Sequence, residues 1–200
     1  MYAYLDGKLA EKQPTTVIID CNGVGYELNI PLSTYDQLPA KGELAHLLVY
    51  YHFNETDGVK LFGFGTRQEK VLFKTLLGVS KIGPRTAIAV LSTLSVEEFE
   101  RAVLEGNLNL IATVPGIGKK SAERLVLELK DRIGMEDSII PDRIYGRSSV
   151  TEDALSALIT LGYSQKDVRK YLSHLTKKYN YKSAEELIKA TIKELHKKDR

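Results

Sequence analysis

The stretch Val79-Ser80-Lys81-Ile82-Gly83-Pro84-Arg85-Thr86-Ala87 returns 35 residues later as Val114-Pro115-Gly116-Ile117-Gly118-Lys119-Lys120-Ser121-Ala122. In a single register the copies share two apolar residues, a glycine, a basic residue, a hydroxyl-bearing residue and an alanine. A short helical pattern precedes each copy, and an amphipathic pattern follows it over 87–91 and 125–133. The repeat therefore predicts a unit of two helices joined by a glycine turn, present twice.

The glycine turns of this repeat suit the binding of phosphate. Amide N–H groups in the first turn of a helix lack a partner within the helix, and the helix dipole adds positive potential there. Glycine lets a phosphate approach closely and tolerates a positive φ, which we expect at Gly118. Because phosphate contacts read no base edges, we expect binding that is independent of DNA sequence. The expected contact residues are Lys81, Ile82, Gly83, Pro84, Arg85, Gly116, Ile117, Gly118, Lys119, Lys120 and Arg124.

Two nucleotide-binding motifs match the second copy in part and fail on specific residues. A P-loop needs Ser or Thr where Lys120 stands and a leading glycine where Thr113 stands. A dinucleotide-binding fingerprint needs its third glycine where Ser121 stands. A plainer alternative stays open, in which both turns are simple corners between helices, although basic residues in both copies argue against it.

Charge is distributed unevenly along the chain, whose formal net charge is only +2. Residues 1–66 carry 4 Lys/Arg against 8 Asp/Glu, residues 67–135 carry 11 against 8, and residues 136–200 carry 13 against 10. An acidic first third beside two mildly basic thirds favours segments with different functions, with ordinary scatter of surface charge as the alternative.

The remaining composition excludes several classes of protein. Cys21 is the only cysteine, so no intrachain disulfide can form, which fits a reducing cytoplasm. The four histidines have no metal-ligand spacing with one another or with Cys21, so we expect no metal and no cofactor. No apolar run approaches the roughly 20 residues of a membrane span, and no signal peptide is visible. We therefore expect a cytoplasmic protein that does not contact a membrane.

Residues 1–65 predict a small β domain. Short runs rich in β-branched and aromatic residues alternate with turn signals, and Tyr26, Leu28 and Ile30 alternate with polar residues at the period of a half-buried strand. Strands are expected over 2–9, 15–20, 26–30, 47–53 and 59–64. Closing them into a barrel would remove the sheet edges.

Helical patterns replace the strands at Thr66, which makes the chain a multidomain α+β protein. Ser/Thr–Glu pairs that can cap a helix start recur at Thr66/Glu69, Ser95/Glu98, Ser149/Glu152 and Ser183/Glu186, with a weaker Ser164/Asp167 pair. We expect a helical DNA-binding domain over 66–134, a linker over 135–148 and a three-helix domain over 149–200. Its apolar stripes are Ala154, Leu155, Leu158 and Leu161; Val168, Leu172 and Leu175; and Leu187, Ile188, Ile192 and Leu195.

The repeat resembles the tandem helix–hairpin–helix motif, and the whole chain resembles the RuvA family of proteins that bind four-way (Holliday) junctions. The order of parts carries the resemblance: a β domain that ends in Leu61-Phe62-Gly63-Phe64-Gly65, two hairpins, a variable linker and a helical C-terminal domain. The second hairpin fits the family closely. In the first hairpin Lys81 stands where the family usually has glycine, and its charge could offset a poorer turn.

The resemblance implies a fold, partners and a process. It implies an OB-type barrel, a homotetramer that could extend to an octamer, and a UBA-like C-terminal domain that contacts the hexameric ATPase RuvB. The junction resolvase RuvC is a further implied partner. The implied function is non-catalytic: structure-specific binding of junction DNA, which loads the RuvB motor for branch migration in recombination, DNA repair and the SOS response.

The family also carries an acidic pin on a barrel loop near the centre of its tetramer. Here the matching loop is 54–58, so Glu55 and Asp57 are the expected pin residues. Carboxylates near phosphates repel them, which is useful where DNA strands must be kept apart. A solvated hairpin tip is the alternative.

Two other functions stay open on the residues alone. A helix–hairpin–helix enzyme acting on bases would need a carboxylate in a base-sized pocket, and Asp131 and Asp137 lie downstream of the second hairpin. However, Asp131 falls on a charged helix face and Asp137 in the expected linker. A generic duplex or single-strand binder could use the barrel as a stacking platform, but the acidic balance of residues 1–66 argues against it.

Overall fold

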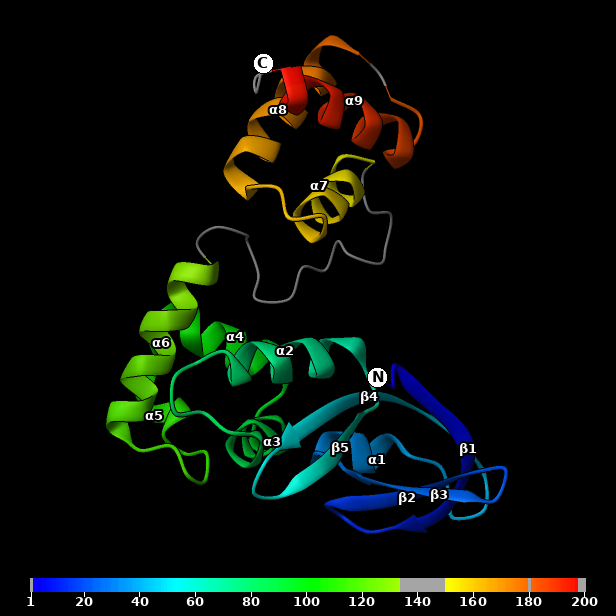
Figure 1. Cartoon of the computed structure of the whole chain (residues 1–200). Helices are drawn as coiled ribbons and strands as arrows, with labels where there is room; N and C mark the ends of the chain where they lie inside the picture. Colours follow the sequence, from blue (N-terminus) through cyan, green and yellow to red (C-terminus); the bar gives the residue numbers. More distant parts are fainter. Residues whose placement is uncertain (1, 134–149, 180, 198–200) are drawn as a thin grey trace. The chain divides into compact units, whose positions relative to one another are not determined.

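The computed structural model describes residues 2–133, 150–179 and 181–197. The chain forms two compact units, Met1–Ile140 and Pro141–Arg200, and each is described here by itself (Figure 1). The expected linker over 135–148 and the Ser149/Glu152 cap lie outside the residues whose side chains the structure describes.

The N-terminal part of the first unit is the predicted closed barrel. Its strands follow the order β1-β2-β3-β5-β4 around the barrel, and β1 closes on β4. All pairs are antiparallel except the short parallel contact of β3 with β5 at Asn29 and Phe62. The strands span Tyr4–Lys12 (β1), Thr16–Cys21 (β2), Val24–Asn29 (β3), Leu44–Asn54 (β4) and Gly58–Phe64 (β5). The expected strands were therefore right in number and order, with ends displaced by up to three residues.

A short helix that the sequence analysis missed, α1 (Leu32–Gln37), connects β3 to β4. It is joined to the following helical part by a buried carboxylate. Glu69, only 3% exposed, accepts hydrogen bonds from the hydroxyls of Ser33 and Thr34 and from the backbone N–H of Thr66. A buried carboxylate is tolerated when its oxygens are hydrogen-bonded in this way, and this one fixes α1 against the start of α2.

The helices of the first unit are α2 (Arg67–Leu77), α3 (Pro84–Thr93), α4 (Val96–Glu105), α5 (Leu108–Ile111) and α6 (Lys119–Ile133). Reciprocal capping boxes begin α2 at Thr66/Glu69 and α4 at Ser95/Glu98, as predicted. Their apolar faces form one cluster that also contains Phe62 and Phe64 of β5. These two aromatics attach the barrel wall to the helical core, while the barrel interior, with Leu9, Ile19 and Leu28, forms a cluster of its own.

The second unit contains α7 (Val150–Thr160), α8 (Gln165–Lys178) and α9 (Ala184–Lys197). Its core consists of Ala154, Leu158, Val168, Leu172, Leu175 and Leu187, which confirms most of the predicted stripes. Leu161 was wrongly placed in the stripe: it is 62% exposed, since α7 ends at Thr160 and Gly162 turns the chain with φ of +94°. None of the helices described in either unit is long and apolar enough to span a bilayer.

Candidate nucleic-acid interface

The two glycine turns have the same backbone structure, 35 residues apart. In the first turn, N–H groups of Val79 and Ile82 donate to the carbonyls of Leu76 and Val79 over 3.0 and 3.1 Å. The equivalent groups of Val114 and Ile117 donate to Ile111 and Val114 over 3.3 and 3.0 Å. After each turn an alanine N–H, Ala87 or Ala122, donates to the glycine that precedes the helix, over 3.0 and 2.9 Å. The sequence repeat is therefore also a structural repeat, in which these three backbone hydrogen bonds occur in both turns.

Positive φ angles occur at a different glycine from the one we expected. The left-handed positions are Gly116, with φ of +86°, and Lys81, with φ of +65°. Gly83 has an extended φ of −99°, and Gly118 is not among the positive-φ residues that the structure describes. Lys81 therefore occupies the position that requires left-handed backbone, and it makes the same turn as Gly116 at a steric cost.

Gly83 and Gly118 instead provide open space in front of a helix. A Cβ atom built on either glycine meets no atom within 4 Å. Behind them the N-termini of α3 and α6 present first-turn amides without helical partners. Pro84 has no N–H, and in the second hairpin the Ser121 N–H already donates to the Gly118 carbonyl over 2.9 Å, so each turn leaves two first-turn amides for a ligand. Both turns can thus admit an anion to the positive end of a helix.

The predicted contact residues separate into two groups. The cationic side chains of Lys81, Arg85, Lys119 and Lys120 are exposed around the turns. The side chains of Ile82 and Ile117 are buried, at 8% and 4% exposure, and belong to the core. Their N–H groups are also occupied within the turn. These isoleucines therefore anchor the turns, and neither their side chains nor their N–H groups are free to bind a phosphate.

Arg124 connects the two hairpins. Its guanidinium, on α6, donates to the carbonyl oxygen of Ser80 in the first turn over 3.4 Å. One helical turn further, the carboxylate of Glu128 accepts from the Ser80 N–H over 3.3 Å. Arg124 was predicted as a phosphate contact and Glu128 was not predicted at all, because nothing in the local sequence pattern relates either residue to Ser80.

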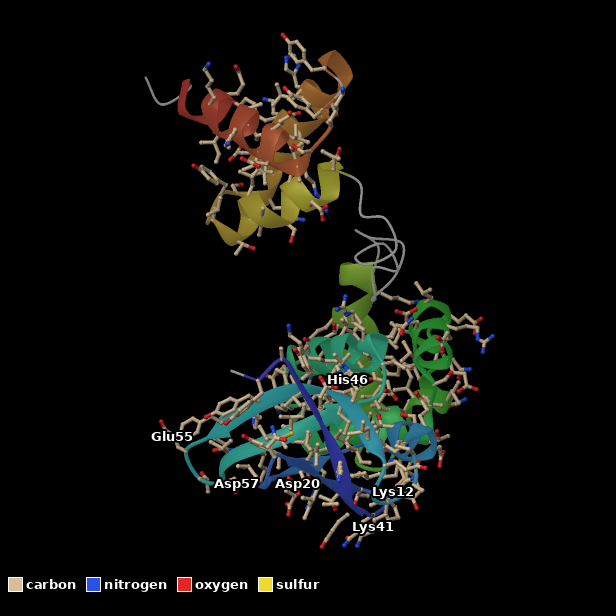
Figure 2. The ribbon with its side chains drawn as sticks, turned by 90° about the vertical axis from the view of Figure 1, so that its right-hand side faces the viewer. Lys12, Asp20, Lys41, His46, Glu55 and Asp57 are labelled. Carbon is tan, nitrogen blue, oxygen red and sulfur yellow. The ribbon has the colours of Figure 1, made fainter. Side chains whose placement is uncertain are left out.

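The expected acidic residues lie on the tight connection between β4 and β5. The Asn54 side chain accepts from the Thr56 N–H over 3.0 Å, and Gly58 completes the turn with φ of +72°. Figure 2 shows Glu55 and Asp57 at the tip of this hairpin. Asp57 forms an ion pair with Lys60, with 2.7 Å between nitrogen and oxygen, and this hydrogen-bonded ammonium lowers the pKa of the Asp57 carboxyl. The tip is therefore less negative than its two acids suggest.

A cleft of about 510 Å³ on the barrel, lined in part by Cys21, carries no catalytic arrangement among the residues described. The Cys21 thiol donates to the carbonyl of Asp6 over 3.2 Å, and the Asp6 carboxylate lies 2.6 Å from His46. Burial raises the pKa of the Cys21 thiol, and the carboxylates of Asp20 and Asp6 raise it further, which disfavours the thiolate. The described residues contain no group of three or more His, Cys, Asp or Glu side chains that could hold a metal ion.

Barrel, repeated turns and a third helical domain define a protein of the tandem helix–hairpin–helix class. Residues 73–131 match the model of the SAM-like helix-hairpin-helix tandem. Residues 1–63 match the RuvA N-terminal domain, and residues 149–196 match the RuvA C-terminal domain. This chain belongs to the RuvA family.

Curated relatives match over most of their length. The protein named Holliday junction branch migration complex subunit RuvA from Geobacter sulfurreducens is 45% identical, over 88% of this chain and 90% of the relative. The protein of the same name from Syntrophotalea carbinolica is 48% identical, over 86% of this chain and 88% of the relative. That from Trichlorobacter lovleyi is 44% identical over 98% of this chain and all of the relative.

Proposed function

We propose that this chain is the non-catalytic junction-binding subunit of a bacterial branch migration complex. It binds four-way junction DNA independently of sequence and holds the junction open for a motor ATPase in the cytoplasm. The observation that carries the proposal is the pair of turns with three corresponding backbone hydrogen bonds, each opening onto the N-terminus of a helix. The printed name of the relatives supports the assignment to junction DNA.

The phosphate grip consists of the two helix N-termini and the cations around them. Backbone amides at Arg85 and Thr86 in the first hairpin, and at Lys119 and Lys120 in the second, are the donors in the first helical turns. Lys81, Arg85, Lys119 and Lys120 add charge-assisted contacts. Arg124 acts mainly by holding the first turn, through Ser80.

Glu55 and Asp57 supply the selectivity for a junction over a duplex. They lie in the same compact unit as the hairpins, so a phosphate backbone that crosses the β4–β5 tip is repelled. At a four-way junction the strands diverge and leave the tip in the opening. In a homotetramer, which we propose as the working assembly with the octamer as an extension, four such tips would meet there.

Residues 149–200 provide the contact with RuvB. The match of residues 149–196 to the RuvA C-terminal domain supports this assignment. Exposed apolar side chains at the end of α7, Ile159 and Leu161, offer a surface of the kind that a protein partner covers. RuvC is proposed as a partner of the protein–junction complex.

A gel-shift titration of the full chain with matched DNAs tests the proposal. A four-way junction, a linear duplex of the same length and a single strand are compared over a series of salt concentrations, with the mass of each complex measured by light scattering. We expect far tighter binding to the junction, with log affinity falling roughly linearly with log salt. Equal affinity for junction and duplex would reject the function, and release of bases from damaged duplex would favour an enzyme instead.

A further inference from the structure

A cleft of about 700 Å³ separates the first hairpin from the β4–β5 hairpin of the barrel. Pro84 and Arg85, at the first turn of α3, line one side. His52, Asp57 and Lys60 belong to the barrel side. The cleft thus begins at the proposed phosphate grip and reaches the acidic tip, with a cation at either side.

Lys60 is held in this cleft by a single weak interaction. Its ammonium group lies 2.7 Å from the Asp57 carboxylate, and the two side chains are 46% and 52% exposed. Exposed ion pairs of this kind contribute little to stability, because water and salt screen them. The ammonium group can therefore exchange one oxyanion for another at small cost.

We propose that Lys60 is a phosphate-binding residue that extends the first hairpin's grip onto the barrel, and that Asp57 positions it there before DNA binds. The inference rests on the proposed function and adds a contact to it. A phosphate that enters beside Arg85 competes with Asp57 for the ammonium group of Lys60, because both anions accept the same charge-assisted hydrogen bond.

The exchange has a consequence for Asp57. When Lys60 turns to a phosphate, the Asp57 carboxylate loses its counter-charge and repels other phosphates that approach the tip. The two members of one ion pair thus have opposite effects on DNA: Lys60 attracts a phosphate into the cleft, and Asp57 repels phosphates at the tip. The acid is masked in free protein and active only in the complex.

Substitution of Lys60 by Met tests the contact, because Met keeps much of the aliphatic stem and removes the charge. Lys41→Met is the matched control, since Lys41 is an exposed lysine of the same barrel that Figure 2 shows away from Glu55 and Asp57. We expect Lys60→Met to weaken junction binding about fivefold to tenfold and to reduce the slope of log affinity against log salt by about one for each chain bound. Lys41→Met should change neither quantity appreciably.

An Asp57→Asn background distinguishes a direct contact of Lys60 with phosphate from an effect of Lys60 on the charge of Asp57. If Lys60 binds phosphate, Lys60→Met still weakens binding and lowers the salt slope when Asp57 has already been replaced. If Lys60 only offsets the charge of Asp57, the second substitution has no effect beyond that of Lys41→Met in the same background. That result would overturn the inference.

Failure of the inference is distinguishable from failure of the proposed function. The wild-type preference for a junction over a duplex, and the weaker binding expected of a Gly118→Val variant in the second hairpin, report on the function alone. If both hold while Lys60→Met behaves like Lys41→Met, the hairpins bind the junction without Lys60. Far-ultraviolet circular dichroism and melting temperature confirm that each variant is folded.

Discussion

The backbone N–H of Ser80 donates to the carboxylate of Glu128 over 3.3 Å, although 48 residues separate them in the chain. Through this bond and the neighbouring one from Arg124, the helix of the second hairpin holds the turn of the first. The two proposed phosphate-binding turns are therefore positioned by each other, as well as by their common core.

Replacement of Glu128 by Ala should loosen the first turn. We expect the free energy of unfolding to fall by about 0.5–1 kcal/mol, the value of one partly exposed hydrogen bond to a charged group. Urea denaturation measures this, and Glu123→Ala, an exposed acid on the same helix, is the control. Equal stability of the two variants would show that the Ser80 bond contributes nothing.

Lys81 and Gly116 offer a paired test of the left-handed position. Lys81→Gly should stabilise the protein by about 0.5–1 kcal/mol, because relief of a positive φ exceeds the added chain entropy of glycine. Gly116→Ala should destabilise it by about 1–2 kcal/mol. Lys81→Gly should also lower the salt dependence of junction binding, since a cation is lost. A destabilised Lys81→Gly variant would contradict the assigned strain.

Gly118→Val should weaken junction binding by about tenfold without unfolding the protein. The reason is access: the new side chain fills the space in front of α6 that a phosphate needs, and it clashes with no protein atom near its Cβ. Gly83→Val should act in the same way but less strongly, because Lys81 already stands in that turn where the second turn has Gly116. Gel shift measures the affinity, and unchanged binding by folded Gly118→Val would refute the assignment of the hairpin.

Neutralising the acidic tip should raise affinity for linear duplex. Each close repulsion is worth on the order of 1 kcal/mol in a wet site, so Glu55→Gln combined with Asp57→Asn should increase duplex binding several-fold at low salt. The control is Glu11→Gln on β1. An unchanged ratio of junction affinity to duplex affinity would show that the loop is only a solvated turn.

A chain that ends near residue 135 should still bind junctions and should fail to stimulate the motor ATPase. Both hairpins and the acidic tip lie in the first compact unit, which has its own core. Junction binding by gel shift and ATP hydrolysis by RuvB are the two measurements. If truncation abolished junction binding, the third domain would belong to the DNA site.

Local patterns predicted most of the fold, and contacts distant in sequence account for what was missed. The spacing of Thr66 and Glu69 predicted the capping pair, but it could not predict the second role of Glu69. The Glu69 carboxylate also accepts hydrogen bonds from the hydroxyls of Ser33 and Thr34 on α1. That helix has only six residues, too few to show a helical period. The repeat supplied the candidate contact residues, and it predicted a positive φ at Gly118, whereas the structure has positive φ at Gly116 and Lys81.

The packing of two barrel phenylalanines in the helical core has a mechanical consequence. Phe62 and Phe64 extend from the barrel wall into the helical cluster, and Glu69 closes the joint beside them. Close-packed interiors of this kind deform little. The distance from the hairpin turns to the β4–β5 tip is therefore nearly fixed, and on binding the DNA deforms more easily than the protein. A bound junction must bring its phosphate backbones to the spacing of these protein elements. The packing of Phe62 and Phe64 against the helices therefore helps to set the geometry of the open junction.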